Sequence, residues 1–136
     1  MKLSSILSFA SVTLATRVAW DAGYDPADRS LNEVACSNGQ NGLENTHPGW
    51  TVLGNIASFP NIGAFQAVGG WNSASCGTCW QVSYGAQTLY VTAIDHAGDG
   101  AVLSKTAFNT LTGGHADEFG VVDAFITQVD NSLCRL

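Results

Sequence analysis

The segment from Gly70 to Trp80 constrains this chain more than any other part of it. It reads GWNSASCGTCW and carries two of the four cysteines and two of the four tryptophans. So many small residues between bulky ones predict a tight, close-packed bend. The remaining cysteines, Cys36 and Cys134, lie far away on either side. We therefore expect both flanks of the chain to be tied to this one segment.

The first residues have the pattern of a secretory signal. Lys2 supplies a positive start, residues 3–14 are mostly apolar, and Thr13-Leu14-Ala15 is a small-residue cleavage site. The apolar run is shorter than the roughly 20 residues that span a bilayer. We predict a signal peptide at 1–15, with cleavage as late as Val18, and one secreted domain at 16–136. The alternative is that the apolar run forms a strand or helix of the domain.

Export would place the four cysteines in an oxidising compartment, where disulfides persist. Four cysteines allow three pairings. One of them joins Cys76 to Cys79 and leaves Cys36–Cys134 to close the whole domain, whereas the other two tie each flank separately to the central segment. We favour Cys36–Cys76 with Cys79–Cys134, which divide the chain into two successive loops. The other pairings stay open at this stage.

The charge balance narrows the class of partner. The chain has 5 Lys and Arg against 11 Asp and Glu, a net charge of −6, and losing Lys2 with the signal would make it −7. Too few cations remain to neutralise a phosphate backbone or an anionic lipid surface, so neither nucleic acid nor a membrane is an expected partner. No other apolar run approaches membrane length. A neutral polar partner such as a glycan suits this composition best.

The pattern along the chain indicates a β-rich domain. Alternating or β-branched runs predict strands at residues 30–36, 50–53, 79–84, 88–94 and 121–129. Glycine and asparagine predict a turn at 37–42, and glycine a hairpin link at 85–87. A polar, flexible loop is expected at 95–100. Residues 60–70 are apolar and rich in glycine, so we expect a buried but irregular segment or a single helical turn.

One helix has clear signals. Ser104 is a suitable N-cap, the apolar residues Ala107, Phe108 and Leu111 recur at helical spacing, and Gly113 ends the element. A further turn is expected at 115–119. Strands outnumber helices, there is no internal repeat and no linker divides the chain. The sequence therefore predicts one compact β-rich domain with a small helix.

The Cys76-Gly77-Thr78-Cys79 spacing raises two alternatives to structural disulfides. A redox motif needs its first cysteine at a helix N-terminus, but the residues after Cys79 alternate as in a strand. A zinc site would combine these cysteines with His96 or His115, yet the spacing matches no closed set of four ligands. We expect disulfides, with no metal and no cofactor.

Asp95 is the strongest candidate for chemistry. It ends an apolar strand and opens a glycine-flanked loop, where a carboxylate can be partly buried and its pKa raised. Such a group could act as the acid of a glycosidase, which normally also needs a second carboxylate. Candidates for the second group are Asp99, Asp117, Glu118 and Asp123. The structural alternative is that Asp95 accepts hydrogen bonds from backbone N–H groups of its own loop.

Side chains suited to sugar recognition occur in several loops. Trp71 is flanked by glycine and Asn72, which favours a surface position, whereas Trp80 lies in a strand pattern and is expected to be buried. The turn at 37–42 exposes backbone N–H groups and amides that suit sugar hydroxyls, although a plain turn explains it as well. His96 could bind a ligand or simply be solvated.

Taken together, these motifs resemble the cerato-platanin family of small secreted fungal proteins. The resemblance covers nearly all of residues 16–136 and rests on WDAGYD (20–25), CSNG (36–39), NGL (41–43), WNSASCGTCW (71–80), AIDHA (93–97), LTGG (111–114) and VDA (122–124). Two departures stand out. The segment ENTHPGW (44–50) differs from the shorter loop of relatives, and Arg135 replaces a usual glycine.

The resemblance implies a mainly β fold, a six-stranded double-psi β-barrel with one or two short helices and two disulfides, similar to the first domain of expansins and to family-45 endoglucanases. It implies first-with-second and third-with-fourth cysteine pairing, in agreement with the pairing favoured above. It also implies binding of chitin oligomers, loosening of cellulose without clear hydrolysis, elicitation of plant defence, and self-association. Asp95 matches the aspartate shared with expansins, and no partner base is identifiable.

The leading hypothesis is a secreted, non-hydrolytic carbohydrate-binding protein that acts at cell walls and elicits host defence. A shallow groove is expected from Asn41-Gly42, Trp71-Asn72 and Asp95-His96, with Tyr24 at its edge. The expected partners are chitin or cellulose oligosaccharides, with a host receptor and self-association as further candidates. The alternatives are a weak glycosidase using Asp95 as acid, and a self-assembling, surface-active structural protein.

Overall fold

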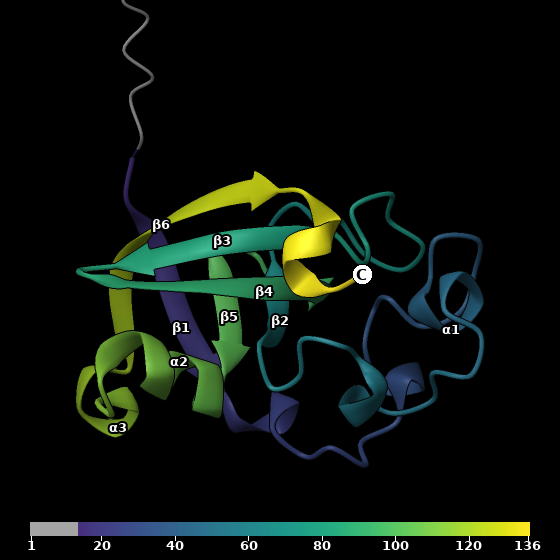
Figure 1. Cartoon of the computed structure of the whole chain (residues 1–136), viewed down its shortest axis with the longest axis horizontal. Coiled ribbons are helices and arrows are strands. Elements are labelled where there is room, and N and C mark those ends of the chain that lie inside the picture. Colours follow the sequence, from purple (N-terminus) through teal and green to yellow (C-terminus); the bar gives the residue numbers. More distant parts are fainter. Residues whose placement is uncertain (1–13) are drawn as a thin grey trace, which may run out of the picture.

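The computed structural model describes residues 14–136, and its six strands close into one barrel (Figure 1). Residues 1–13, which carry most of the predicted signal peptide, lie outside the described part. The strands are β1 (Thr16–Asp21), β2 (Ile62–Phe65), β3 (Cys79–Tyr84), β4 (Gln87–His96), β5 (Ala101–Ser104) and β6 (Val121–Val129), joined in the order β1-β5-β2-β4-β3-β6. The β1–β5 and β2–β4 pairs are parallel and the other pairs antiparallel. The mainly β, six-stranded fold class is confirmed.

Three strands follow the sequence pattern, and three do not. β3 and β6 have the predicted bounds, and β4 extends the predicted strand at both ends. β1, β2 and β5 were not predicted. Within β2 all four residues are buried, so no alternation marks the strand. Its Gly63 is required for packing, because a Cβ there would lie 2.5 Å from the carbonyl oxygen of Val102 on β5.

The strands predicted at 30–36 and 50–53 are wrong. Only Ser30 and Val52 form a bridge, and each segment continues as a short 3-10 turn. Ser30 Oγ accepts the N–H of Asn32, and Asn55 Oδ1 accepts the N–H groups of Thr51 and Val52. Short polar side chains here satisfy the backbone donors that a sheet partner would otherwise take.

The helix predicted from Ser104 is confirmed as α2 (Lys105–Thr112). Ser104 Oγ accepts the N–H of Ala107 at 3.0 Å, and Gly113 ends the helix with φ +73°. Asp25, distant in sequence, also accepts the N–H groups of Lys105 and Thr106 at 2.9 and 3.0 Å. The turn expected at 115–119 is α3 (Ala116–Phe119), and α1 (Leu43–Thr46) was not predicted.

Both disulfides have the favoured pairing, Cys36–Cys76 and Cys79–Cys134. Since Cys76 and Cys79 bond to different partners, the redox and zinc alternatives are wrong. Within residues 14–136, no group of three or more His, Cys, Asp or Glu side chains lies close enough to hold a metal ion. In the same part of the chain, no helix is both long and apolar enough to cross a bilayer.

Arg135 has a backbone conformation that suits glycine. Its φ is +63°, a left-handed conformation that glycine adopts without steric cost. The Arg135 guanidinium donates a hydrogen bond from Nη2 to the carbonyl oxygen of Ala57 at 2.8 Å. This contact ties the C-terminus to the segment between β1 and β2.

Substitution of two glycines in the loop before β5, Gly98 and Gly100, tests how closely this loop packs on β1. At Gly100, which has φ +55°, a Cβ would lie 1.8 Å from the carbonyl oxygen of Arg17. We expect Gly100→Ala to lower the free energy of unfolding by about 2–4 kcal/mol. A Cβ at Gly98 would have no other atom within 4 Å, so Gly98→Ala should change it by less than about 0.5 kcal/mol. Guanidinium unfolding would measure both, and equal stabilities would contradict the close approach.

Candidate functional site

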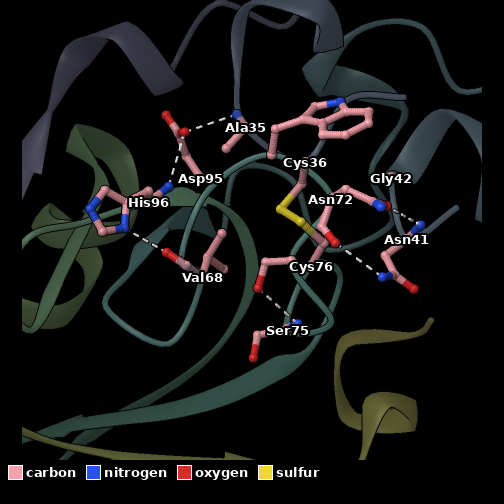
Figure 2. Close-up of a disulfide and its surroundings, with 12 residues drawn as sticks. Ala35, Cys36, Asn41, Gly42, Val68, Asn72, Ser75, Cys76, Asp95 and His96 are labelled. Carbon is pink, nitrogen blue, oxygen red and sulfur yellow. Dashed lines mark hydrogen bonds between the residues drawn. A yellow bond between two sulfur atoms is a disulfide. The ribbon is translucent and has the colours of Figure 1, made fainter. Parts of the chain in front are cut away.

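Asp95 lies near the end of β4 and accepts hydrogen bonds from three donors, of which Figure 2 shows Ala35 and His96. Its Oδ1 accepts the N–H groups of Ala35 and His96 at 2.9 and 3.0 Å, and its Oδ2 accepts the Tyr24 hydroxyl at 2.7 Å. The carboxylate therefore joins three segments of chain. This arrangement includes the backbone-binding role that the sequence left as the structural alternative.

A register shift positions the Asp95 side chain. Gly63 of β2 pairs with Ala93, whereas the next residue, Ala64, pairs with Asp95. Ile94 is thus an extra residue of β4, and Ala93 and Ile94 are both fully buried. A bulge of this kind re-aims the side chain that follows it. As a result, Asp95 turns toward the partly exposed end of the barrel, where it meets Ala35.

Tyr24 lies beneath Asp95 and not at the edge of a groove. Its side chain is only 6% exposed, so its ring cannot stack on a sugar. Burial, and then the adjacent Asp95 carboxylate, raise the pKa of Tyr24 far above its usual range. Tyr24 therefore stays protonated and donates its hydrogen bond to Asp95 at any ordinary pH.

His96 is exposed beside Asp95 and has one ring nitrogen engaged. Its Nδ1 lies 2.6 Å from the carbonyl oxygen of Val68. A carbonyl only accepts, so Nδ1 carries the proton in this contact. The other nitrogen, Nε2, has no hydrogen-bond partner among residues 14–136. His96 can therefore accept a hydrogen bond from a ligand hydroxyl.

Asn41 and Asn72 hold two loops together. Asn72 Oδ1 accepts the backbone N–H of Asn41 at 2.8 Å, and Asn41 Nδ2 donates to the carbonyl oxygen of Asn72 at 3.0 Å. Only Asn41 Oδ1 and Asn72 Nδ2 remain for a ligand. Gly42 is buried, and a Cβ there would lie 2.2 Å from the carbonyl oxygen of Asn38. These residues shape the surface more than they present polar groups on it.

The Cys36–Cys76 disulfide connects the two clusters. Figure 2 shows it between Asp95–His96 and Asn41–Asn72. Cys36 N–H donates to the carbonyl oxygen of Ile94 at 3.1 Å, which brings the 35–42 loop against the end of β4. The structure thus brings five of the seven predicted site residues to one surface, whereas Gly42 and Tyr24 are buried beneath it.

Trp71 is the most exposed aromatic residue of this surface, with 63% of its area accessible. Its Nε1–H donates to Asn38 Oδ1 at 2.6 Å. A Cβ at Gly39 would lie 2.9 Å from the indole ring, so the ring packs where that glycine leaves room. The predicted surface position is confirmed, and the ring is held in one orientation.

A polar hollow of about 390 Å³ adjoins Trp71 through Asn38. It is lined by Asn38, Gly39, Gln40, Glu44 and Asn45. Three side-chain amides and one carboxylate therefore face a space next to an exposed indole. Polar recognition by the 37–42 turn was expected from the sequence, but Asn38, Gln40, Glu44 and Asn45 were not singled out. The signal available was an amide-rich turn followed by the unusual 44–50 segment.

The 44–50 segment forms α1 and an aromatic stack. His47 and Trp50 lie with ring centroids 3.9 Å apart and planes 8° apart. Burial lowers the pKa of His47 below its usual value. The neutral ring then stacks on Trp50 at neutral pH, and the stack fixes the chain just after Glu44 and Asn45.

The carboxylates proposed as partners of Asp95 do not form a recognisable pair with it. Asp117 and Glu118 lie on α3, where they contact Lys105 and His115, and Asp123 lies on β6. Figure 1 shows α3 and the start of β4 at the end of the molecule opposite α1, whereas Asp95 is the second-last residue of β4. Asp99 follows Asp95 in an exposed loop. Asp95 is also already engaged by three donors, so its geometry fits the structural role better than that of a general acid.

The comparison with known proteins agrees with this fold. The cerato-platanin family profile matches residues 16–136. "Allergen Asp f 15" of Aspergillus fumigatus is 42% identical over 117 residues, covering 86% of this chain and 75% of the relative. The crystal structure of cerato-platanin 2 from M. perniciosa has a TM-score of 0.84 at 39% identity and covers 90% of this chain and 99% of its own. The solution structure of "the fungal elicitor Cerato-Platanin" has a TM-score of 0.76 at 38% identity, with 87% and 95% covered. None of these names states a catalytic activity.

Replacing Asp95 tests whether it holds three segments together. Asp95→Ala would leave the N–H groups of Ala35 and His96 and the Tyr24 hydroxyl without their acceptor, and we expect a loss of about 2–4 kcal/mol in the free energy of unfolding. Asp95→Asn keeps one acceptor oxygen and should lose about 1 kcal/mol. Asp99→Ala in the exposed loop is the matched control. Equal unfolding midpoints for Asp95→Ala and this control would contradict the role.

The raised pKa of Tyr24 predicts a pH dependence. A tyrosine in the unfolded chain loses its proton near its ordinary pKa of 10.0, whereas buried Tyr24 keeps it. The unfolded state therefore binds fewer protons above this pH, so the wild-type protein loses stability as pH rises further.

Tyr24→Phe removes this dependence along with the hydrogen bond to Asp95. We expect the variant to be less stable by about 1–3 kcal/mol near pH 8, with the gap narrowing toward about pH 11. The other tyrosines are common to both proteins, so their effects cancel. Guanidinium unfolding at both pH values measures the gap, and a constant gap would refute the proposed linkage.

Proposed function

Since the chain belongs to the cerato-platanin family, we propose that it is a secreted, non-hydrolytic protein that binds neutral glycans of the chitin type at cell walls. Members of this family are small secreted fungal proteins. The observation that carries the proposal is the fixed, exposed indole of Trp71 beside a hollow lined by amides. An aromatic face and a few placed polar groups are the usual elements of a small-ligand site.

The chemistry of the hollow favours an N-acetylated sugar. Asn38, Gln40 and Asn45 carry amide groups that can pair with the acetamido group as well as with hydroxyls. A glucose unit offers only hydroxyls. The ring of Trp71 supplies the apolar surface on which one sugar face can rest. We therefore expect chitin oligomers to bind more tightly than cello-oligomers of equal length.

The 95–96 segment extends the site without catalysing a reaction. Asp95 uses its acceptor positions mainly for Ala35, His96 and Tyr24, so its contribution to binding is to hold this surface. His96 Nε2 is the group that a second sugar unit would meet. A role in host defence rests on one relative described as a fungal elicitor; glycan binding at the wall would place this protein where a host receptor meets it.

The proposed secretion sets a limit on signal cleavage. β1 begins at Thr16 and its Val18 is fully buried in the core. Cleavage as late as Val18 would remove the first half of β1, including Thr16 and Arg17, which pair with β6. We propose that the leader ends before Thr16, so that the exported chain keeps the whole strand.

An NMR titration of residues 16–136 with chitin oligomers, and then with cello-oligomers, tests the function. We expect saturable shifts at residues 38–45, 71–72 and 95–96. Trp71→Ala should weaken binding about 10-fold or more, or about 1.4 kcal/mol. Phe125→Ala, which shortens another exposed aromatic residue, is the control and should bind as the wild type does. Shifts that are absent with both sugars would remove the basis of the proposal.

A further inference from the structure

A further hollow lies at the opposite end of the molecule from α1. It has a volume of about 650 Å³ and is lined chiefly by Arg17, Tyr84, Glu118, Phe119, Val121 and Asp123. These residues come from the start of β1, the end of β3, α3 and the start of β6. Figure 1 shows α3 and the β3–β4 tip at one end of the long axis and α1 at the other. We name this hollow the α3 cleft.

The α3 cleft combines exposed aromatic and apolar side chains. Phe119 and Val121 are 40% and 37% exposed, and Tyr84 is partly exposed. Phe125, which lies further along β6 on the same face as Val121, is also exposed. Apolar side chains gathered on a surface often mark a binding site. The hollow is wide and open, and its volume lies within the range of small-ligand sites.

The charges of the α3 cleft give it an excess of one negative charge, from two carboxylates and one guanidinium. Arg17 and Asp123 lie opposite each other in the β1–β6 register, but neither forms an ion pair within residues 14–136. Glu118 uses one oxygen, Oε1, to accept a hydrogen bond from His115 Nδ1 at 2.7 Å. At least three carboxylate oxygens therefore remain available to a cationic ligand.

We propose that the α3 cleft is a second binding site, which takes the ammonium-bearing glucosamine units of deacetylated chitin. The ammonium group pairs with Glu118 and Asp123, and the apolar face of the sugar ring lies on Phe119 or Tyr84. A cation close to an aromatic face gains further electrostatic attraction. The choice of a sugar as ligand rests on the proposed function. The preference for a cationic unit rests on the cleft's own charges and on the net charge of −6.

The two sites would then bind different sugar units of a partly deacetylated polymer. The hollow beside Trp71 offers amide groups to acetylated units, and the α3 cleft offers carboxylates to deacetylated ones. Because the sites lie at opposite ends of the molecule, one protein would contact two chains of a wall or two distant parts of one chain. Such a bridge strengthens attachment through effective concentration, without any additional contact.

The test is an NMR titration of a Trp71→Ala protein with glucosamine oligomers and, separately, with N-acetylglucosamine oligomers. At about pH 5.5, exposed carboxylates in proteins are mostly ionised. Glucosamine oligomers should shift the amides of residues 84 and 118–123, and the acetylated oligomers should not. Raising the ionic strength from about 0.01 M to about 0.5 M should weaken this binding strongly, because screening reduces the attraction between exposed charges.

Two carboxylate variants locate the site. Glu118→Gln combined with Asp123→Asn should weaken glucosamine binding about 5- to 10-fold, the effect of losing two exposed charge contacts. Asp117→Asn, on the same helix but outside the cleft, removes a charge and should change affinity less than about 2-fold. Equal affinities for the double variant and this control would overturn the proposal.

The outcomes separate this proposal from the proposed function. Glucosamine shifts confined to residues 38–45 and 71–72 of the wild-type protein, and absent from the Trp71→Ala protein, would overturn the second site while leaving the first intact. Shifts at residues 118–123 together with no chitin binding at Trp71 would support the second site and refute the first. Shifts of equal size with both oligomers would overturn the charge preference.

Discussion

The structure depends on how a long irregular segment of chain is fastened to a small barrel. Between β1 and β2, residues 22–61 contain one isolated bridge and no strand. The Cys36–Cys76 disulfide crosses from the middle of this segment to the bend before β3. Leu31, Leu43, Leu53 and Ile56 anchor the same segment in the core. Without the covalent link, these few apolar contacts would have to offset the conformational entropy of the whole segment.

Hydrogen bonds from backbone N–H groups to carboxylates are the second kind of interaction that holds the irregular parts of the chain in place. Asp25 binds the first N–H groups of α2, Asp95 binds Ala35, and Asp130 accepts the N–H of Ser132 in the turn that carries Cys134. The hydrogen bonds from Ser132 lower the pKa of Asp130. Each carboxylate satisfies backbone donors at a place where no strand is available. An acidic composition in this protein therefore reflects its architecture as much as its ligands, and counting carboxylates overstates the case for a glycosidase.

The sequence predicted those elements whose signals are local. The α2 helix, the β3–β4 hairpin and β6 each carry their own caps, turn or β-branched run, and the cysteine spacing favoured the observed disulfides. β2 and β5 were missed because four-residue strands buried in a barrel show no alternation. The 30–36 segment was misread because its backbone donors are satisfied by Ser30 and by Asp95, which is distant in sequence. These contacts join residues that are distant in sequence. The sequence therefore predicted Asp95 as a site residue, but not the Tyr24 and Ala35 donors that contact its carboxylate.

The irregular segment and the bend before β3 also build the surface around Trp71, and this follows from the barrel's own constraints. The strands of a small closed barrel fill its interior with side chains, so a ligand is expected at the loops and not inside the barrel. Loops can present amides and an indole on a surface, but only if their backbone is held still. Three features hold the backbone of these loops in place: the Asn41–Asn72 hydrogen bonds, the contact of Gly39 with Trp71, and the Cys36–Cys76 disulfide. A preorganised surface loses less entropy on binding, and the proposed binding of a flexible polymer at a shallow site depends on that saving.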